Sequence, residues 1–186
     1  MHNVIFAFVG PSGSGKSTII AEMLRRFPDR LGVIRSVTTR AKRSAEDDLN
    51  YRFLTRDEFA ALRVAGRLIQ GVEYAGQFYG NDRTDADEVF SSGRQGLIAL
   101  VEDGIVNFRN AGYRVAMIRI MPVGDYDGRS EERRLADAER ARKGPLPDIE
   151  IENDFARGGL DRAVNAAADF IQGYLDGLST QPPNCS

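Results

Sequence analysis

The chain has 186 residues, of which 42% are hydrophobic and 28% charged, and its formal net charge is −2. That length suits one domain with a sizeable core, and so small a net charge does not indicate a protein that coats nucleic acid or anionic lipid. The apolar runs VIFAFV and GLIALV are far shorter than the ~20 residues that span a bilayer, and no leader-like segment precedes the first. We therefore expect a cytoplasmic protein with no nucleic-acid or membrane partner. Its single cysteine, Cys185, cannot form an internal disulfide.

The first predicted elements are a strand and the helix that follows it. Residues 3–10, NVIFAFVG, form an apolar run that ends at a glycine, as a buried strand does. Residues 16–27, KSTIIAEMLRRF, have the apolar spacing and composition of a helix. A further helix is predicted to start at TRDEF, where Thr55 is the N-cap and Glu58, three residues on, completes a capping box.

The rest of the chain continues the alternation of strands and helices. Residues 96–101, GLIALV, are apolar on both faces, which a central parallel strand requires, and residues 113–120, YRVAMIRI, form another strand. A last helix is indicated by apolar residues on one helical face: Leu160, Ala163, Val164, Ala167, Ile171, Tyr174 and Leu175. This order predicts an α/β fold with a parallel sheet flanked by helices. Residues 36–80 and 122–147 break the pattern and are interpreted as functional inserts.

The strongest chemical motif is GPSGSGKS, which lies between the first strand and its helix and matches the phosphate-loop pattern in full. Its glycines allow backbone N–H groups to turn toward a polyphosphate, and the start of the helix adds its positive dipole end. Lys16 is predicted to reach the β- and γ-phosphates, and the Ser17 hydroxyl to bind Mg²⁺. The predicted ligands are therefore a nucleoside triphosphate and magnesium. The predicted binding residues are Gly10, Pro11, Ser12, Gly13, Ser14, Gly15, Lys16 and Ser17.

A second anion site is predicted from SVTTRAKR, residues 36–43. Transfer of a phosphoryl group to another phosphorylated molecule requires cations that hold this second phosphate in line with the first. Arg40 and Arg43, with Tyr51 in NYRF and Tyr79 in GQFYG, provide two guanidinium groups and two phenolic donors for one phosphate. Taken alone, the same residues also fit a solvated basic loop.

The chain resembles the guanylate kinases, because GPSGSGKST, SVTTRAKR, NYRFLTRDEF, GQFYG, GRSEERRL and IENDF follow in the family's order and approximate spacing. The resemblance implies a P-loop kinase fold that transfers a phosphoryl group from ATP to GMP or dGMP, with Mg²⁺ as cofactor. It also implies a core (residues 1–35, 81–121 and 148–178), a monophosphate-binding insert (36–80) and a short lid (122–147). Either a monomer or a homodimer is expected.

The resemblance also implies roles for single residues. Lys16, Arg40, Arg129 and Arg134 correspond to catalytic residues, the two last being lid arginines that arrive over the transferring phosphate. Further ATP-side contacts are implied for Thr18 and for Asn153 in IENDF. The residues that correspond to acceptor ligands are Ser36, Arg40, Arg43, Tyr51, Gln70 and Tyr79.

The departures from the family concern recognition of the base. Gln70 stands where the family has a guanine-reading glutamate, and Ala99 and Val101 stand at two acidic positions. A carboxylate accepts from N1–H and the 2-amino group of guanine, whereas a glutamine amide offers one acceptor group and one donor group. We therefore expect a weaker preference for guanine. Alternative carboxylates for the base are Glu73, Glu102 and Asp103, and Glu102 is also a candidate for ordering Mg²⁺-bound water.

Two other functions remain open from the sequence. Ribose 1,5-bisphosphate phosphokinase shares the core and lacks the guanine carboxylates, but the presence of Arg43 and Tyr51 favours a nucleotide acceptor. A non-catalytic guanylate-kinase-like binding module is the other alternative, and Lys16 and the lid arginines argue against it because such a module has no use for them.

Overall fold

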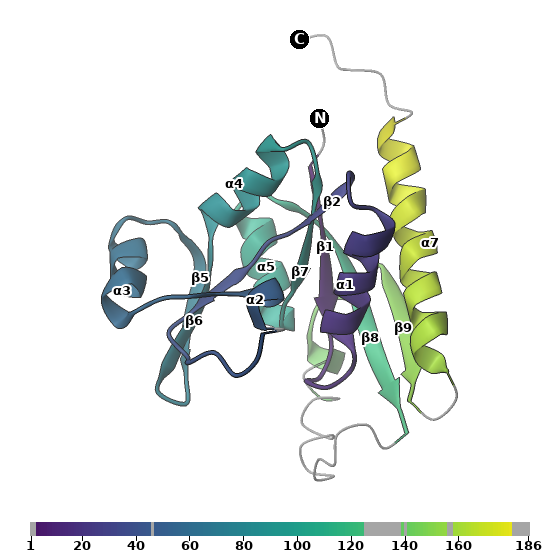
Figure 1. Cartoon of the computed structure of the whole chain (residues 1–186), viewed down its shortest axis with the longest axis horizontal. Coiled ribbons are helices and arrows are strands. Elements are labelled where there is room, and N and C mark those ends of the chain that lie inside the picture. Colours follow the sequence, from purple (N-terminus) through teal and green to yellow (C-terminus); the bar gives the residue numbers. More distant parts are fainter. Residues whose placement is uncertain (1–2, 46, 125–138, 140, 156–157, 180–186) are drawn as a thin grey trace.

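A five-stranded parallel sheet lies at the centre of the structure (Figure 1), a computed structural model that describes residues 3–45, 47–124, 139, 141–155 and 158–179. Every strand pair in this sheet is parallel. The sequence-based prediction of a parallel α/β sheet is confirmed. In sheet order the strands are β2 (Leu31–Val33), β7 (Gln95–Ala99), β1 (Val4–Val9), β8 (Arg114–Val123) and β9 (Ile149–Asp154).

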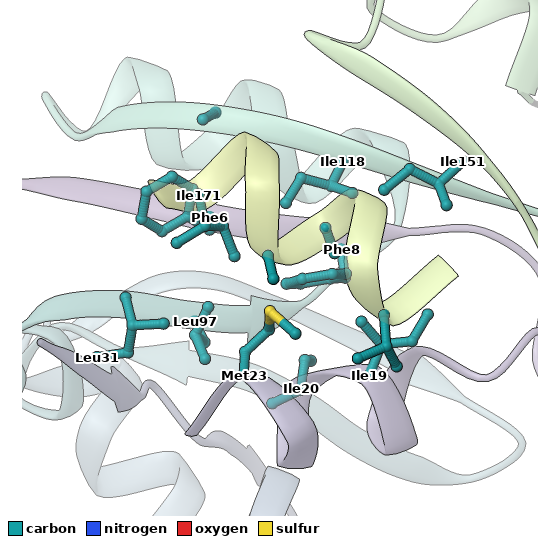
Figure 2. Close-up of a cluster of buried hydrophobic side chains, with 14 of the residues drawn as sticks. Phe6, Phe8, Ile19, Ile20, Met23, Leu31, Leu97, Ile118, Ile151 and Ile171 are labelled. Carbon is teal, nitrogen blue, oxygen red and sulfur yellow. The ribbon is translucent and has the colours of Figure 1, made fainter. Parts of the chain in front are cut away.

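Helices cover both faces of this sheet, and β1 supplies side chains to each. Phe6 and Phe8 pack with α1 (Lys16–Arg26) and α7 (Gly159–Ser179), as Figure 2 shows for the cluster around Met23. The alternate residues Ile5 and Ala7 face α4 (Arg83–Ser91) and α5 (Glu102–Asn110). Since successive residues of a strand point to opposite faces, a fully apolar β1 is what a sheet buried on both sides needs.

A second sheet is built from the segment between β2 and α4 (Figure 1). Helix α3 (Arg56–Val64) packs on one of its faces, where Phe59 stacks on Phe78 with ring centroids 5.3 Å apart. Thr55 caps this helix in the predicted capping box with Glu58. In sheet order the strands are β4 (Tyr51–Phe53), β3 (Ser36–Thr38), β6 (Gln77–Asp82) and β5 (Leu68–Tyr74), and the short helix α2 (Asp47–Asn50) precedes β4.

The strand register decides which side chains lie on the face away from α3. Val37 packs with Phe59 under α3, so its neighbours Ser36 and Thr38 point the other way. Cross-strand partners share a face, and Ser36 pairs with Tyr51 while Thr38 pairs with Tyr79. The face opposite α3, which we call the open face, therefore carries Ser36, Tyr51, Tyr79, Asn81 and Gln70.

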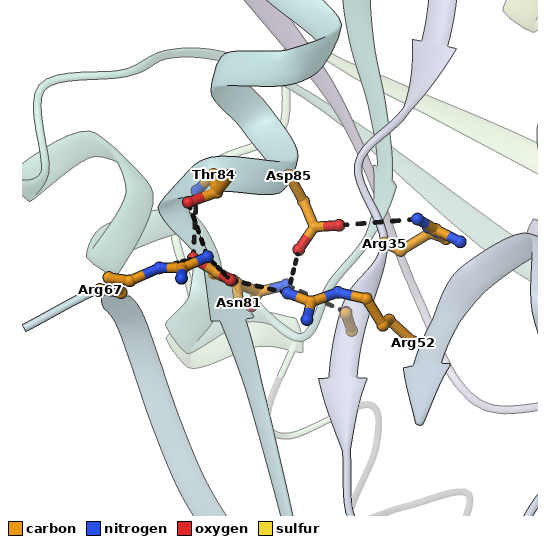
Figure 3. Close-up of polar contacts among 8 residues, drawn as sticks. Arg35, Arg52, Arg67, Asn81, Thr84 and Asp85 are labelled. Carbon is orange, nitrogen blue, oxygen red and sulfur yellow. Dashed lines mark hydrogen bonds and ion pairs between the residues drawn. The ribbon is translucent and has the colours of Figure 1, made fainter. Parts of the chain in front are cut away.

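Ion pairs fasten the second sheet to the start of α4 (Figure 3). Arg52 on β4 donates to Asp82 at 2.7 Å and to Asp85 at 2.8 Å. Arg67, just before β5, donates to Asp82 at 2.5 Å, and Arg35, just before β3, lies 4.0 Å from Asp85. Asp82 and Asp85 are buried, so this cluster ties the segments around Arg35, Arg52 and Arg67 to the start of α4.

Two observations complete the fold. Leu160, which the helical periodicity placed on the apolar face of the last helix, lies in the first turn of α7 and is 36% exposed. Among the helices of the described ranges, none is long and apolar enough to cross a membrane.

Candidate active site

The phosphate loop follows the carboxyl end of β1 and requires glycine at defined points. Gly10, Gly13 and Gly15 have φ values of 141°, 80° and 93°, which side-chain-bearing residues rarely adopt. A Cβ atom on Gly10 would lie 2.4 Å from the carbonyl oxygen of Ile120 on β8. The loop is therefore pressed against the neighbouring strand, and its glycines are needed for both conformation and space.

Lys16, the first residue of α1, has its ammonium group over this loop. Its Nζ donates to the carbonyl oxygens of Gly10 at 2.8 Å and Pro11 at 2.6 Å, and it lies 3.4 Å from Ser14 Oγ. The ammonium group therefore lies where the phosphate loop meets the start of α1. The positive end of the helix dipole and the backbone N–H groups also favour an anion there.

Asn153, a predicted ATP-side residue, lies behind the loop. It is fully buried at the end of β9 and donates from Nδ2 to the carbonyl oxygen of Ser14 at 3.0 Å. A Cβ atom on Gly15 would lie 2.6 Å from the same Nδ2. Its Oδ1 has no hydrogen-bond partner among the described residues. Asn153 therefore braces the loop backbone, a role that the sequence did not indicate.

Ser17, the predicted magnesium ligand, is in contact with the insert. Asn50 of α2 donates from Nδ2 to Ser17 Oγ at 3.0 Å. The described residues contain no group of three or more His, Cys, Asp or Glu side chains placed to hold a metal. A single hydroxyl still fits Mg²⁺, which usually keeps several waters and takes other ligands from substrate phosphates. Glu102, the other candidate, is buried in the first turn of α5.

Arg40 is one of the two arginines predicted to bind the acceptor phosphate, and its guanidinium contacts one carboxylate and two aromatic rings. Its Nη1 donates to Asp47 Oδ2 at 3.0 Å, and its guanidinium lies 5.2 Å from the ring centroid of Tyr51 and 5.7 Å from that of Phe53. The hydrogen bond from Arg40 is the main cause that lowers the pKa of Asp47. Burial raises the pKa of Tyr51, so its phenol stays a neutral donor at physiological pH. Tyr79 is close enough to contribute to the electrostatics of Arg40 and Tyr51.

Arg43 is joined to Arg40 through Asp47, which it contacts with its backbone. Its N–H donates to Asp47 Oδ2 at 2.8 Å, and its side chain is exposed. Asp47 thus bonds Arg40 through a guanidinium and Arg43 through an amide, so one carboxylate sets the relative position of both arginines. Lys42 is not part of this arrangement, because it pairs with Asp48 on the outside of α2.

Gln70 and Ser36, the two residues predicted to face the base, belong to a chain of neutral hydrogen bonds with Asn81 and Asn107, which we call the amide relay. Asn107 of α5 donates from Nδ2 to Gln70 Oε1 at 2.8 Å. Gln70 donates from Nε2 to Asn81 Oδ1 at 2.8 Å, and Asn81 donates from Nδ2 to Ser36 Oγ at 3.0 Å. Asn81 is 1% exposed. A Cβ atom on Gly104 would lie 3.0 Å from Gln70 Nε2, so this glycine lets α5 approach the relay.

Of the carboxylates suggested for the base, Glu73 is not in the place of Gln70, and Glu102 and Asp103 lie in the first turn of α5. Glu73 pairs with Phe78 and lies on the face of the second sheet that α3 covers. Ala99 ends β7, and Val101 is the N-cap residue of α5 with 54% of its surface exposed. The two positions therefore add no acid beside the relay.

Arg129 and Arg134, the arginines predicted for a lid, lie outside the described residues. The segment that returns from this region is held by Arg119 on β8, which sequence reasoning missed. Its Nη2 donates to the carbonyl oxygens of Ala141 at 3.1 Å and Pro145 at 3.0 Å, and its Nη1 donates to Glu150 at 2.9 Å. Its one sequence signal is a charge inside the apolar run VAMIRIM.

Comparison with known proteins gives one consistent result. A family model described as guanylate kinase matches residues 2–144. A guanylate kinase of Thermosynechococcus vestitus is 31% identical over 164 residues, which cover 81% of this chain and 85% of that protein. A guanylate kinase of Bordetella pertussis is 41% identical over 97 residues, 52% of this chain and 45% of that protein. The crystal structure of guanylate kinase from Anaplasma phagocytophilum is similar with a TM-score of 0.63 at 25% identity, covering 96% of this chain and 87% of that chain.

Proposed function

Because the chain belongs to the guanylate kinase family, we propose that it transfers the γ-phosphoryl group of ATP to GMP or dGMP, giving ADP and the corresponding diphosphate. The observation that carries this proposal is the bond from Asn50 to Ser17. It joins the phosphate loop to the helix whose Asp47 holds Arg40 and Arg43. Two groups of residues suited to phosphate are thus adjacent, as transfer between two phosphates requires.

The donor side of the reaction rests on the loop and α1. The backbone N–H groups of the loop and the helix start would hold the β- and γ-phosphates, with Thr18 in the first turn and Asn153 bracing the loop from behind. Lys16 would move from the loop carbonyls to the phosphate oxygens. The Ser17 hydroxyl, together with phosphate oxygens, would hold magnesium, which would supply neutralisation of charge on the transferring group.

The acceptor side rests on the open face of the second sheet. Arg40 and Arg43 would bind the acceptor phosphate through N–H donors, and the neutral phenols of Tyr51 and Tyr79 would complete its coordination. Asp47 accepts hydrogen bonds from both Arg40 and Arg43 and so fixes their relative position. The acceptor phosphate would therefore be oriented before ATP binds. Arg129 and Arg134 would neutralise the developing charge from the lid, which also excludes water.

A second candidate acceptor is ribose 1,5-bisphosphate. The observation that favours it is the replacement of guanine-reading acids by Gln70, Ala99 and Val101. The amide relay argues for a base instead, because polar groups fixed by hydrogen bonds are suited to reading a polar edge.

The test is a coupled assay of ADP release from MgATP with GMP, dGMP, ribose 1,5-bisphosphate or no acceptor. Transfer to GMP and dGMP is expected, with Lys16→Ala lowering turnover by ~10³-fold or more, on the scale of other cations that stabilise this transition state. ADP release that depends only on the sugar bisphosphate would assign the second candidate. A protein that releases no ADP with any acceptor would show that the proposed activity is wrong.

A further inference from the structure

We infer that the amide relay reads the acceptor base through Gln70 and selects purine nucleoside monophosphates by one hydrogen-bond donor and one acceptor, without reading the 2-amino group of guanine. Asn107 is then a positioning residue, because it acts through Gln70 and sets the orientation of the Gln70 amide. This inference rests on the proposed function, since it concerns the acceptor of the same transfer.

The strand register places the relay beside Tyr51 and Tyr79, two of the residues predicted to bind the acceptor phosphate. Tyr79 and Asn81 lie two residues apart on one face of β6, about 7 Å along the strand. Gln70 pairs with Asn81, and Ser36 pairs with Tyr51, so all lie on the open face. An acceptor whose phosphate contacts the two phenols therefore extends its base along this face toward the relay.

The hydrogen bonds within the relay determine what Gln70 has left to offer. A glutamine amide has two N–H donors and two oxygen lone pairs. Asn107 uses one lone pair, and Asn81 uses one N–H. One N–H and one oxygen lone pair of Gln70 therefore take no part in the relay. A carboxylate in the same place would offer acceptors only.

Purine bases match this remaining pair in two ways. Guanine and hypoxanthine both present the O6 acceptor next to the N1–H donor, whereas adenine presents the 6-amino donor next to the N1 acceptor. An amide has one donor and one acceptor for either edge, and in DNA glutamine and asparagine bind another donor–acceptor pair of adenine, its 6-amino group and N7, in the same two-bond manner. The 2-amino group, which distinguishes guanine from hypoxanthine, has no role in this pairing. GMP and IMP should therefore be similar acceptors.

The direction of the hydrogen bonds along the relay, which we call its polarity, can also be reversed in all members together. A half-turn of each amide exchanges its oxygen and nitrogen, after which Gln70 donates to Asn107, Asn81 donates to Gln70, and the Ser36 hydroxyl donates to Asn81. The hydroxyl permits this because it can act as donor or acceptor. One polarity suits the order of groups on guanine and hypoxanthine, and the opposite polarity suits adenine. AMP is therefore also a member of the accepted class.

The first experiment compares kcat/KM for GMP, IMP and AMP in the full chain by ADP release. IMP should lie within about 5-fold of GMP, because its missing group leaves nothing unpaired in the site. Gln70→Glu should lower IMP relative to GMP by ~10–100-fold, the loss expected for one hydrogen bond to a charged group. An IMP value ~100-fold or more below GMP in the unaltered chain would overturn the inference and leave the proposed function standing. Failure with all three nucleotides would overturn the proposed function itself.

The second experiment tests the relay with two matched variants. A carboxylate only accepts, so Asn107→Asp fixes the reversed polarity, whereas Asn81→Asp fixes the polarity that the structure has. Both variants add one negative charge, yet they should move the AMP to GMP ratio of kcat/KM in opposite directions, each by ~10-fold. Shifts in the same direction, or equal losses for both nucleotides with no change in ratio, would refute a positioning role for Asn107. The comparison of IMP with GMP needs no variant and decides the base reading even if either variant fails to fold.

Discussion

Asn50 donates its side-chain amide to the hydroxyl of Ser17 at 3.0 Å, across 33 positions of the sequence. The bond joins α2 of the second sheet to the first turn of α1. Asn50 thus links α2 directly to the predicted magnesium ligand. The same short helix begins with Asp47, the carboxylate that accepts from Arg40.

Asn50→Ala should weaken acceptor binding. A hydrogen bond of this kind contributes about 0.5–1.5 kcal/mol, so its loss should raise the KM for GMP about 2- to 10-fold by loosening α2 from the loop. The measurement is steady-state kinetics at saturating MgATP. Asp48→Ala is the matched control, because Asp48 lies in the same helix and makes only an exposed pair with Lys42. Equal effects of the two variants would rule out a specific role for Asn50.

Arg43→Ala should weaken all nucleoside monophosphates alike. Arg43 is expected to bind the phosphate, which every acceptor shares, so kcat/KM should fall by ~10–100-fold with the ratios between GMP, IMP and AMP unchanged. Lys42→Ala is the control, because Lys42 lies beside Arg43 but pairs with Asp48. The assignment of Arg43 to the phosphate fails if its replacement changes the preference between bases.

Asp82→Asn should destabilise the fold in a pH-dependent way. Burial raises the pKa of Asp82, but bonds from the Thr84 N–H, Arg67 and Arg52 outweigh it, and the net pKa is lowered. A lowered pKa in the folded state adds stability above the unfolded value near ~3.9, and this is lost as pH falls toward the folded value. We expect a loss of about 1–3 kcal/mol at pH 7 that shrinks below about pH 4.

Urea unfolding of both proteins between pH 7 and pH 3 measures this difference. Glu22→Gln is the control, because Glu22 pairs with Arg25 on the exposed surface of α1, where an ion pair is screened by solvent and contributes little to stability. A difference for Asp82→Asn that stays constant over the whole range would show that the ion cluster at α4 does not carry this stability.

Arg129→Ala and Arg134→Ala should lower kcat more than they change KM, because lid arginines act mainly in the closed state. The expected loss for either is ~10³-fold or more in kcat if it contacts the transferring phosphate. Arg133→Ala is the control, because it removes a neighbouring positive charge that is not assigned to the transferring phosphate. Effects on KM alone would make both residues ordinary substrate contacts, and the assignment of a lid would be wrong.

The elements predicted correctly depend on local signals. The strand before the phosphate loop and the helix after it follow from an apolar run, a glycine and a helical period. The N-cap at Thr55 follows from two residues three positions apart. Strand β2 has only three residues, LGV, which give no period, so only pairing with β7 defines it.

The site is less predictable because its arrangement is tertiary. Asn107 and Asn50 look like ordinary polar residues until α5 and α2 bring them to Gln70 and Ser17. Glu73 is close to Gln70 in sequence, yet strand alternation sends it to the opposite face. Residue types and their spacing in the sequence therefore indicated the two phosphate sites. The hydrogen-bond partners of these residues could be identified only once the strand register of the two sheets was known.

The bond from Asn153 to the carbonyl of Ser14 spans 139 positions and has a consequence for biosynthesis. A ribosome releases the N-terminal part of a chain first, so the loop leaves the exit tunnel long before the strand that braces it. Until β9 has docked beside β8, the loop lacks this support and its glycines keep their full freedom. Nascent chains that stop short of β9 should therefore hold ATP poorly even where β1 and α1 are complete. Nucleotide affinity would then appear late in translation, as a sign that the last strand has joined the sheet.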